Sequence, residues 1–176
     1  ILRLDWLYDV PKDRREASMQ ILSQKCLDAF CSGNVSYRSN WVYGLTYVGD
    51  AVERLYKASV CERHKETLYH ISSGEPFSEK QIAEAIEQIR GNKVKLIDNT
   101  VETPRCAYLD NSCAKEEFGF KVWITPEKMV ERILSYMEHH SGRFLNESDK
   151  GAGWLRRIWY RLKRTMGAVF PFVENM

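Results

Sequence analysis

The sequence predicts a mixed α/β domain followed by a basic amphipathic helix. Segments of strand-like composition alternate with segments whose apolar residues recur at helical spacing, which is typical of α/β folds. The 176 residues are 44% hydrophobic and 28% charged, an ordinary balance for one domain with its own core. No segment repeats at a fixed period, so the sequence does not indicate a solenoid.

Each element follows from a local pattern. Strands are expected where bulky apolar residues alternate or run together, at 1–8, 35–37, 46–48, 67–71 and 94–97. Helices are expected where apolar residues share one face, at 19–30, 51–59, 78–91, 110–118 and 126–140. The end of the last of these helices carries His139 and His140, which as cations would favour a helix C-terminus.

Several helix ends carry recognisable signals. Ser78 and Gln81 form a capping-box pattern, and Pro126 occupies the first position of a helix. Asp50 is expected to cap the helix that begins at Ala51, and Asp110 is expected to cap the helix at 110–118.

The net charge of +2 hides an uneven distribution. Residues 151–176 carry five basic and one acidic residue, so the preceding part is slightly acidic. Residues 141–153 are polar and without periodicity, which predicts a linker between a domain at 1–140 and a tail at 154–176. The tail is expected to dock on its own domain, to join a homodimer, or to contact a membrane surface. Its charge is too small to indicate nucleic acid.

The cysteines are expected to be free thiols in a reducing compartment. There are five of them, with no Cys-x-x-Cys pair and no recognised zinc spacing, so we expect no metal site. No apolar run is long enough to span a bilayer, and no signal-like segment follows Ile1. We therefore expect a cytoplasmic protein, or one peripheral to the inner face of the membrane.

No familiar catalytic motif is complete. The sequence contains no Gly-rich nucleotide loop, no His-Glu-x-x-His and no Gly-x-Ser-x-Gly. Tyr8 and Lys12 have the Tyr-x-x-x-Lys spacing that brings a phenol and an ammonium together on a helix. Pro11 lies between them, directly after a strand-like segment, so we expect a strand end and a surface lysine instead.

Five short stretches together resemble a known superfamily. They occur in order at 47–52 (YVGDAV), 68–78 (LYHISSGEPFS), 109–115 (LDNSCAK), 118–120 (FGF) and 125–127 (TPE). This series resembles the extended short-chain dehydrogenases/reductases, the NAD-dependent epimerase/dehydratase superfamily, over about residues 1–140. Residues 3–8 (RLDWLY) and Pro104-Arg105 are most similar to dTDP-4-dehydrorhamnose reductase-like proteins.

The resemblance implies the distal part of a Rossmann-type sheet with a small substrate-binding lobe. In such proteins the Gly-rich loop and the catalytic Tyr-x-x-x-Lys precede the strand that matches 1–8. The chain then corresponds to the substrate-binding portion of an NAD(P)-dependent nucleotide-sugar reductase or epimerase/dehydratase. NAD or NADP would bind to the cofactor-binding half. The alternative is a non-catalytic regulatory or binding subunit that retains the lobe.

The resemblance also suggests substrate-binding residues. Arg105 would bind the substrate diphosphate, for which a guanidinium offers a bidentate fork. Trp6 would pack on the sugar ring, and Arg38 would face the phosphates. Trp41 and Tyr43 would line the loop that faces the substrate. Each of these side chains could instead have an ordinary packing or surface role.

Overall fold

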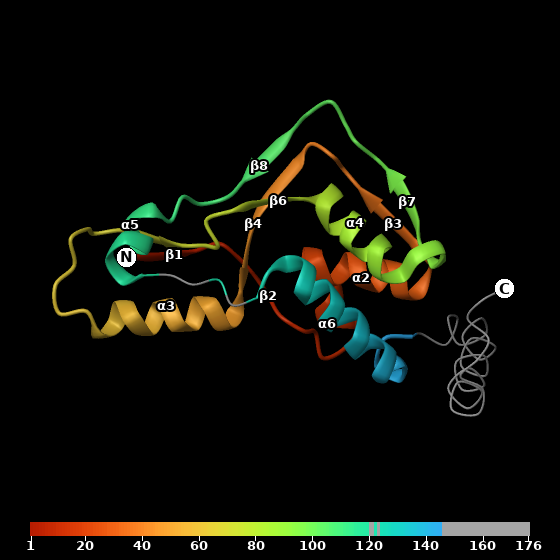
Figure 1. Cartoon of the computed structure of the whole chain (residues 1–176), viewed down its shortest axis with the longest axis horizontal. Coiled ribbons are helices and arrows are strands. Elements are labelled where there is room, and N and C mark those ends of the chain that lie inside the picture. The colour runs from red at the N-terminus through yellow and green to blue at the C-terminus, as the bar shows by residue number, and fades with distance from the viewer. Residues whose placement is uncertain (120–121, 123, 146–176) are drawn as a thin grey trace, which may run out of the picture.

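The computed structural model describes residues 1–119, 122 and 124–145 and has the expected α/β fold (Figure 1). The strands are β1 (Leu2–Leu4), β2 (Trp6–Tyr8), β3 (Asn34–Tyr37), β4 (Trp41–Tyr47), β5 (Tyr69–Ile71), β6 (Pro76–Ser78), β7 (Lys95–Asp98) and β8 (Arg105–Ala107). The helices are α1 (Arg14–Met19), α2 (Ile21–Cys31), α3 (Val48–Val60), α4 (Glu79–Arg90), α5 (Ser112–Phe118) and α6 (Pro126–His139). Short 3-10 turns follow α4 and α6.

Strand β4 is the centre of the largest sheet. It pairs in parallel with β2 and β8 and antiparallel with β6. Two further parallel pairs, β1 with β5 and β3 with β7, complete the pairing among the described residues. Most of the pairs are therefore parallel, as a Rossmann-type sheet requires.

The expected strand at 1–8 is two strands that join different sheets. The break lies at Asp5, whose backbone N–H donates to the carbonyl of Ile71 and whose carboxylate accepts from the N–H of Trp6 at 2.9 Å. Before this residue the chain pairs with β5, and after it the chain pairs with β4. The apolar alternation predicts extended backbone correctly but carries no signal for the change of partner.

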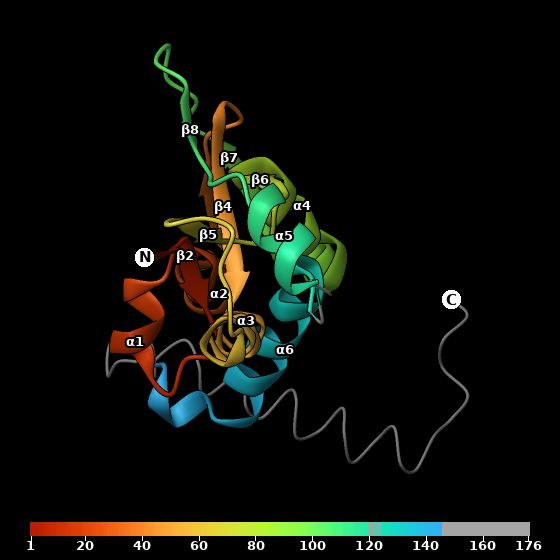
Figure 2. The ribbon, with the colours of Figure 1, turned by 90° about the vertical axis from the view of Figure 1, so that its left-hand side faces the viewer.

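The main core lies between the large sheet and helices α2, α4 and α6, which pack on one another. Figure 2 shows α4 and α6 on the same side of the strand layer. Fully buried side chains from each helix meet there, including Leu22, Ile86 and Met129. These residues lie on the apolar faces that the helical spacing predicts.

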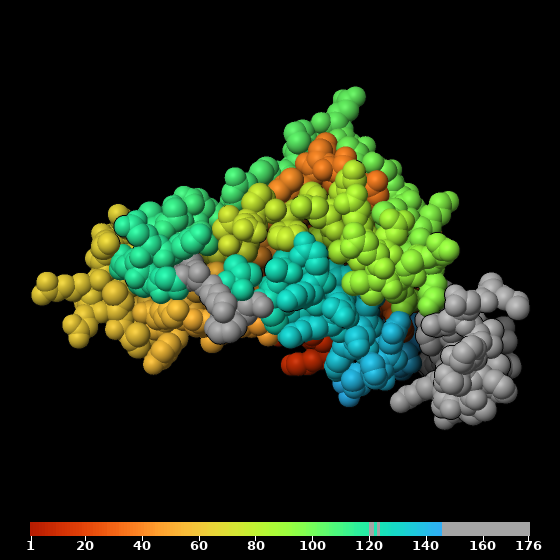
Figure 3. Space-filling view, viewed as in Figure 1, coloured from red at the N-terminus to blue at the C-terminus, as the bar shows by residue number. Residues whose placement is uncertain are grey.

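A second and smaller core lies under α3. It consists of Ala51, Tyr69, Ile71 and Ala114, with Phe118 packed against them. Helices α3 and α5 lie side by side here, at one end of the molecule (Figures 1 and 3). This part has few buried side chains of its own and leaves several large apolar residues of β1 and α3 exposed.

Three helix starts differ from expectation. Helix α3 begins at Val48 with Tyr47 as its cap, so Asp50 is a buried first-turn residue and not the cap. The cap of α5 is Asn111, while the Asp110 carboxylate accepts from the N–H and hydroxyl of Ser112. The segment at 19–30 is interrupted, because extended backbone at Gln20 separates α1 from α2.

Other helix ends are as predicted. The Ser78–Gln81 capping box is formed in both directions, and Pro126 follows the capping residue Thr125. Strands β6 and β8 were not expected, since each has only three residues and lacks a clear apolar alternation.

The packed domain extends slightly past the boundary expected at 140. Residues Ser141–Arg143 form a 3-10 turn, and Phe144 is fully buried against the main core. The remainder of the expected linker and the tail at 154–176 lie outside the described residues. Within the part of the chain that is described, no helix is both long and apolar enough to cross a membrane.

Candidate functional site

The five side chains predicted to bind substrate lie together on one side of β4. Trp41 and Tyr43 are two residues apart on this strand and therefore share a face. Strand β8 places Arg105 directly opposite Trp41, and the neighbouring strand β2 brings Trp6. Arg38 lies just before β4, where it reaches the ring of Trp41. The pairing of β4 with β8 thus explains how residues more than sixty positions apart meet.

The three aromatic rings form a box around the Arg105 guanidinium. The Trp6 and Tyr43 ring centres are 5.1 Å apart, and Trp41 meets Tyr43 edge-on at 6.3 Å. The Arg105 guanidinium carbon lies 5.4 to 5.9 Å from all three ring centres. The Arg38 guanidinium stacks on Trp41 at 3.9 Å. Such cation–π contacts orient both guanidinium groups without neutralising them.

The charge of this cluster is positive and accessible. Arg105 is exposed and Trp6 is 44% exposed, so the guanidinium and one indole are open to solvent. Across residues 1–119 and 124–145, no carboxylate forms an ion pair with Arg38 or Arg105. Two guanidinium groups without an acidic partner are suited to an anion with several oxygens, such as a diphosphate.

Beneath the box lies a buried carboxylate that the sequence did not indicate. Glu79 begins α4 and is 3% exposed. Its Oε1 accepts from the Tyr43 hydroxyl at 3.0 Å, and its Oε2 accepts from the Arg38 backbone N–H at 2.9 Å and from Lys25 Nζ at 3.1 Å. Glu79 therefore fixes the positions of Tyr43 and of the Arg38 backbone. Its only sequence signal is its place after the capping residue Ser78, which says nothing about burial.

The Tyr43 hydroxyl is held by its hydrogen bond to Glu79. Burial raises the pKa of Tyr43 well above its ordinary value, and the negative charge of Glu79 raises it further. The hydroxyl hydrogen is committed to the Glu79 carboxylate. The ring contributes shape to the cluster, whose two guanidinium groups are suited to binding.

At the edge of the site, Asp5 and Gly44 are in close contact. The carboxylate of Asp5 lies over Gly44, where an added Cβ would come within 1.6 Å of Asp5 Oδ2. Only glycine leaves room for this carboxylate beside Trp6 and Tyr43. Burial raises the pKa of Asp5, while hydrogen bonds from backbone N–H groups and the charge of His70 act against that increase.

Tyr8 and Lys12 do not form a catalytic pair. Tyr8 is buried at the end of β2, and its hydroxyl donates to the carbonyl of Ile124 at 2.8 Å. Burial raises the pKa of Tyr8 strongly, with smaller contributions from nearby acidic groups led by Asp50. Lys12 lies in the turn that follows, where its backbone N–H donates to Glu16. This agrees with the expected strand end.

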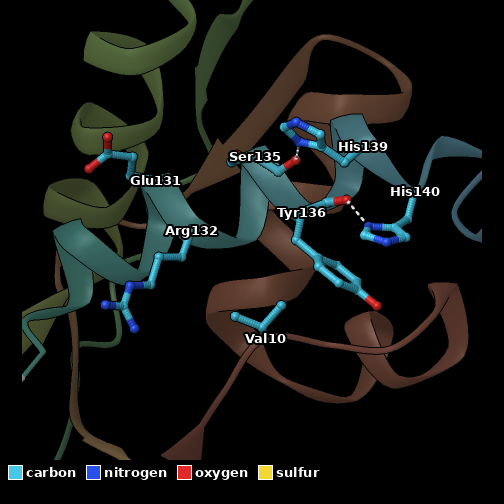
Figure 4. A pocket seen from close by; sticks show the side chains of 7 residues that line it. All are labelled: Val10, Glu131, Arg132, Ser135, Tyr136, His139 and His140. Carbon is cyan, nitrogen blue, oxygen red and sulfur yellow. Dashed lines mark hydrogen bonds between the residues drawn. The ribbon is translucent and has the colours of Figure 1, made fainter.

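A hollow of about 560 Å³ lies elsewhere, beside the C-terminal half of α6 (Figure 4). Its two histidines are engaged with the helix itself. His139 Nδ1 contacts the carbonyl of Ser135 at 2.7 Å, and His140 Nδ1 contacts that of Tyr136 at 3.1 Å. Since a carbonyl can only accept, these nitrogens carry the hydrogens. The histidines satisfy the helix end, as expected, and do not face a catalytic partner.

Comparison with known proteins places the fold. No protein-family model and no curated protein sequence matches the chain. Among solved structures, an NAD-dependent NDP-hexosamine 5,6-dehydratase involved in tunicamycin biosynthesis matches with a TM-score of 0.63 at 14% identity, over 79% of this chain and 45% of its own. UDP-glucuronic acid 4-epimerase from Bacillus cereus, in complex with UDP-glucuronic acid and NAD, matches with 0.62 at 14% identity and the same coverage.

A monomeric L-threonine 3-dehydrogenase from a metagenome matches nearly as well, with a TM-score of 0.60 at 14% identity, over 78% of this chain and 47% of its own. The chain thus has the fold of these enzymes and spans a little under half of their length. Because the group includes both sugar-nucleotide and amino-acid enzymes, the fold alone does not select a substrate.

The sequence lacks the turn that holds the pyrophosphate of a dinucleotide in such folds. That turn has the pattern Gly-x-Gly-x-x-Gly and lies between a strand and a helix. NAD is named for the dehydratase and for the epimerase complex.

Proposed function

We propose that the chain is the substrate-binding portion of an NAD(P)-dependent nucleotide-sugar enzyme, a reductase or epimerase/dehydratase related to the dTDP-4-dehydrorhamnose reductase-like proteins. The observation that carries this proposal is a cluster in which two guanidinium groups, neither paired with a carboxylate of the described residues, lie beside exposed indole. A nucleotide sugar offers the matching chemistry, namely a diphosphate and the C–H face of a ring.

Within this proposal each residue has a distinct task. Arg105 binds the diphosphate, and Arg38, which stacks on Trp41, adds a second positive charge. Trp6 presents its exposed face to the sugar. Trp41 and Tyr43 hold the arginines in place, and Tyr43 is itself held by Glu79.

The cofactor and the proton-transfer groups would come from a second part that pairs with β1. Parallel sheets are normally covered on both faces and rarely consist of two strands. Among the described residues β1 pairs with β5 alone, and its Leu2 and Leu4 remain 37% and 42% exposed. An open parallel edge with exposed apolar side chains supports the addition of further strands here.

Calorimetric titration of the chain with UDP-glucuronic acid, a dTDP-sugar and L-threonine tests the proposal. We expect a nucleotide sugar to bind and to change tryptophan fluorescence, because Trp6 and Trp41 lie in the cluster. Preference for the dTDP-sugar would support the rhamnose reductase-like assignment. Arg105→Ala should weaken binding roughly 10- to 100-fold, which corresponds to the loss of a charged hydrogen-bonding group.

The matched control is Arg15→Ala, which removes an exposed arginine from α1 and should leave the affinity unchanged. Failure of every nucleotide sugar to bind, or equal affinity of the Arg105→Ala variant, would contradict the proposal. Binding of L-threonine in their place would reassign the cluster to an amino-acid substrate.

A further inference from the structure

We propose that Cys61, His64 and Glu117 form a binding site for a divalent metal ion, with zinc as the best-suited ion. The three side chains lie at the end of the molecule where α3 and α5 meet, away from the aromatic box. One ligand atom of each residue lies within 4.8 Å of the corresponding atoms of the other two. The expectation of no metal site overlooks the Cys-x-x-His spacing of Cys61 and His64, while the third residue, Glu117, lies more than fifty positions further along the chain.

The fold brings these residues from three local structures. Cys61 is the residue that ends α3, and His64 lies in the following loop before β5. Glu117 lies in the last turn of α5, which packs against α3. The Cys-x-x-His spacing provides two ligands from one turn of chain, and α5 supplies the third from across the small core.

Two of the separations between ligand atoms are close to those of a tetrahedral zinc site. Zinc bonds of about 2.3 Å to sulfur and about 2.0–2.2 Å to nitrogen and oxygen place ligand atoms roughly 3.3–3.7 Å apart. Glu117 Oε1 lies 3.8 Å from Cys61 Sγ and 3.6 Å from His64 Nδ1. A single carboxylate oxygen therefore faces both the thiol and the imidazole, and small side-chain movements would bring all three ligand atoms within bonding distance of one ion.

The surroundings fix the ligands in this orientation. The other carboxylate oxygen, Glu117 Oε2, accepts from the Tyr69 hydroxyl at 2.7 Å and from the Lys65 backbone N–H at 3.3 Å. The His64 ring lies against Tyr69 and Phe118, with ring centres 5.8 and 5.9 Å away. Hydrogen bonds to ligating carboxylates are the usual means by which proteins orient metal ligands. The Glu117 side chain is only 8% exposed, whereas His64 is 42% exposed and leaves a path for the ion.

Three protein ligands leave one tetrahedral position for water or for a ligand from another molecule. Bound zinc would join α3, the loop that follows it and α5 where the second core is small. The ion would thus stabilise the end of the molecule that has the least buried apolar surface of its own.

Titration of the reduced, metal-free full chain with Zn²⁺ and, separately, with Co²⁺ tests this inference. We expect one ion per chain, a rise in Tm with zinc, and a thiolate-to-cobalt charge-transfer band typical of a cysteine ligand. Cys61→Ser should remove the band and weaken zinc binding at least about tenfold, and Glu117→Gln should weaken it similarly. His64→Ala, a change at a half-exposed side chain, should also weaken zinc binding at least about tenfold and replaces the cysteine variant if that variant fails to fold.

Cys113→Ser is the matched control, since this exposed thiol lies on α5 beside the site but outside it. It should retain both the band and the zinc affinity. A chain that gives no charge-transfer band, or whose band persists in Cys61→Ser and disappears in Cys113→Ser, would overturn the proposal.

Discussion

Replacing Glu79 by glutamine should destabilise the protein by about 3 kcal/mol, because it leaves the Lys25 ammonium without its counter-charge. The two side chains are 12% and 4% exposed for Lys25 and Glu79, and their charged atoms are 3.1 Å apart. Removal of one partner of a buried ion pair costs about 3–5 kcal/mol, since the remaining charge stays desolvated.

The lower end of this range applies for two structural reasons. Lys25 keeps a hydrogen bond to the carbonyl of Ser36 at 2.6 Å, and a glutamine oxygen can still accept from the Tyr43 hydroxyl. The Glu79→Gln variant loses the negative charge and one acceptor oxygen, but its side chain has nearly the same volume. The effect is large compared with the 5–15 kcal/mol that usually separates folded and unfolded states.

Urea unfolding followed by far-UV circular dichroism measures this change. Lys25→Met should also destabilise the protein, because it leaves the buried Glu79 carboxylate without the ammonium. The double variant should cost about 2 kcal/mol less than the sum of the single variants, since residues in direct contact couple by this order. Glu84→Gln on the same helix is the control, because its pair with Lys80 is about half exposed and should change stability by less than about 0.5 kcal/mol.

Strict additivity of the two substitutions would refute this reasoning. So would a cost below about 1 kcal/mol for Glu79→Gln with an unchanged denaturant slope. Either result would mean that water reaches the pair and screens it.

Three other substitutions test the remaining features of the fold. The raised pKa of Asp5 means that the folded state holds this proton more tightly, so its contribution to stability is greatest below the ordinary aspartate pKa and is lost as pH rises to the raised value. Urea unfolding across the acidic range should therefore show Asp5→Asn gaining stability relative to the parent as pH rises; a constant difference would refute this. Gly44→Ala should cost about 1–3 kcal/mol because its Cβ meets the Asp5 carboxylate, and a smaller penalty in an Asp5→Ala background would identify that clash as the cause. Phe144→Ala should lower the free energy of unfolding by about 3–5 kcal/mol, whereas Met19→Ala, at a 77% exposed position, should change it by less than about 0.5 kcal/mol; equal effects would place Phe144 outside the core.

The sequence predicted the elements whose signals are local. The capping box at Ser78 and the proline at the start of α6 are set by residues within one turn of each other, and both are present. The apolar faces of α2, α4 and α6 were recognisable because helical spacing repeats over several turns. The division of the first strand at Asp5 was not predictable, because it depends on Ile71 and Gly44 from distant segments.

The same distinction applies to the candidate site. The resemblance selected five side chains by type and position, and the structure brings all five into one cluster, whereas their role in binding remains a prediction. Two residues were not predicted from the sequence, namely the buried Glu79 and the distant Glu117. Glu79 is buried only because Lys25 and Tyr43 converge on it, and Glu117 approaches Cys61 only through the packing of α5 on α3.

In the aromatic box, the charged group proposed to bind ligand and the buried contacts that stabilise the box belong to different residues. Arg105 lies on the short strand β8 at the surface, so its charge can be removed with little loss of buried contact. Tyr43 is buried on β4 and tied to Glu79, so the shape of the box depends on the main core. A change at Arg105 should therefore reduce ligand affinity without affecting the free energy of unfolding, whereas a change at Glu79 should affect both. Ligand affinity and the free energy of unfolding should therefore be measured for the Arg105 and Glu79 variants. If the Arg105 guanidinium only packs against the rings, the Arg105 variant should lose stability together with affinity. If it binds ligand, that variant should lose affinity alone.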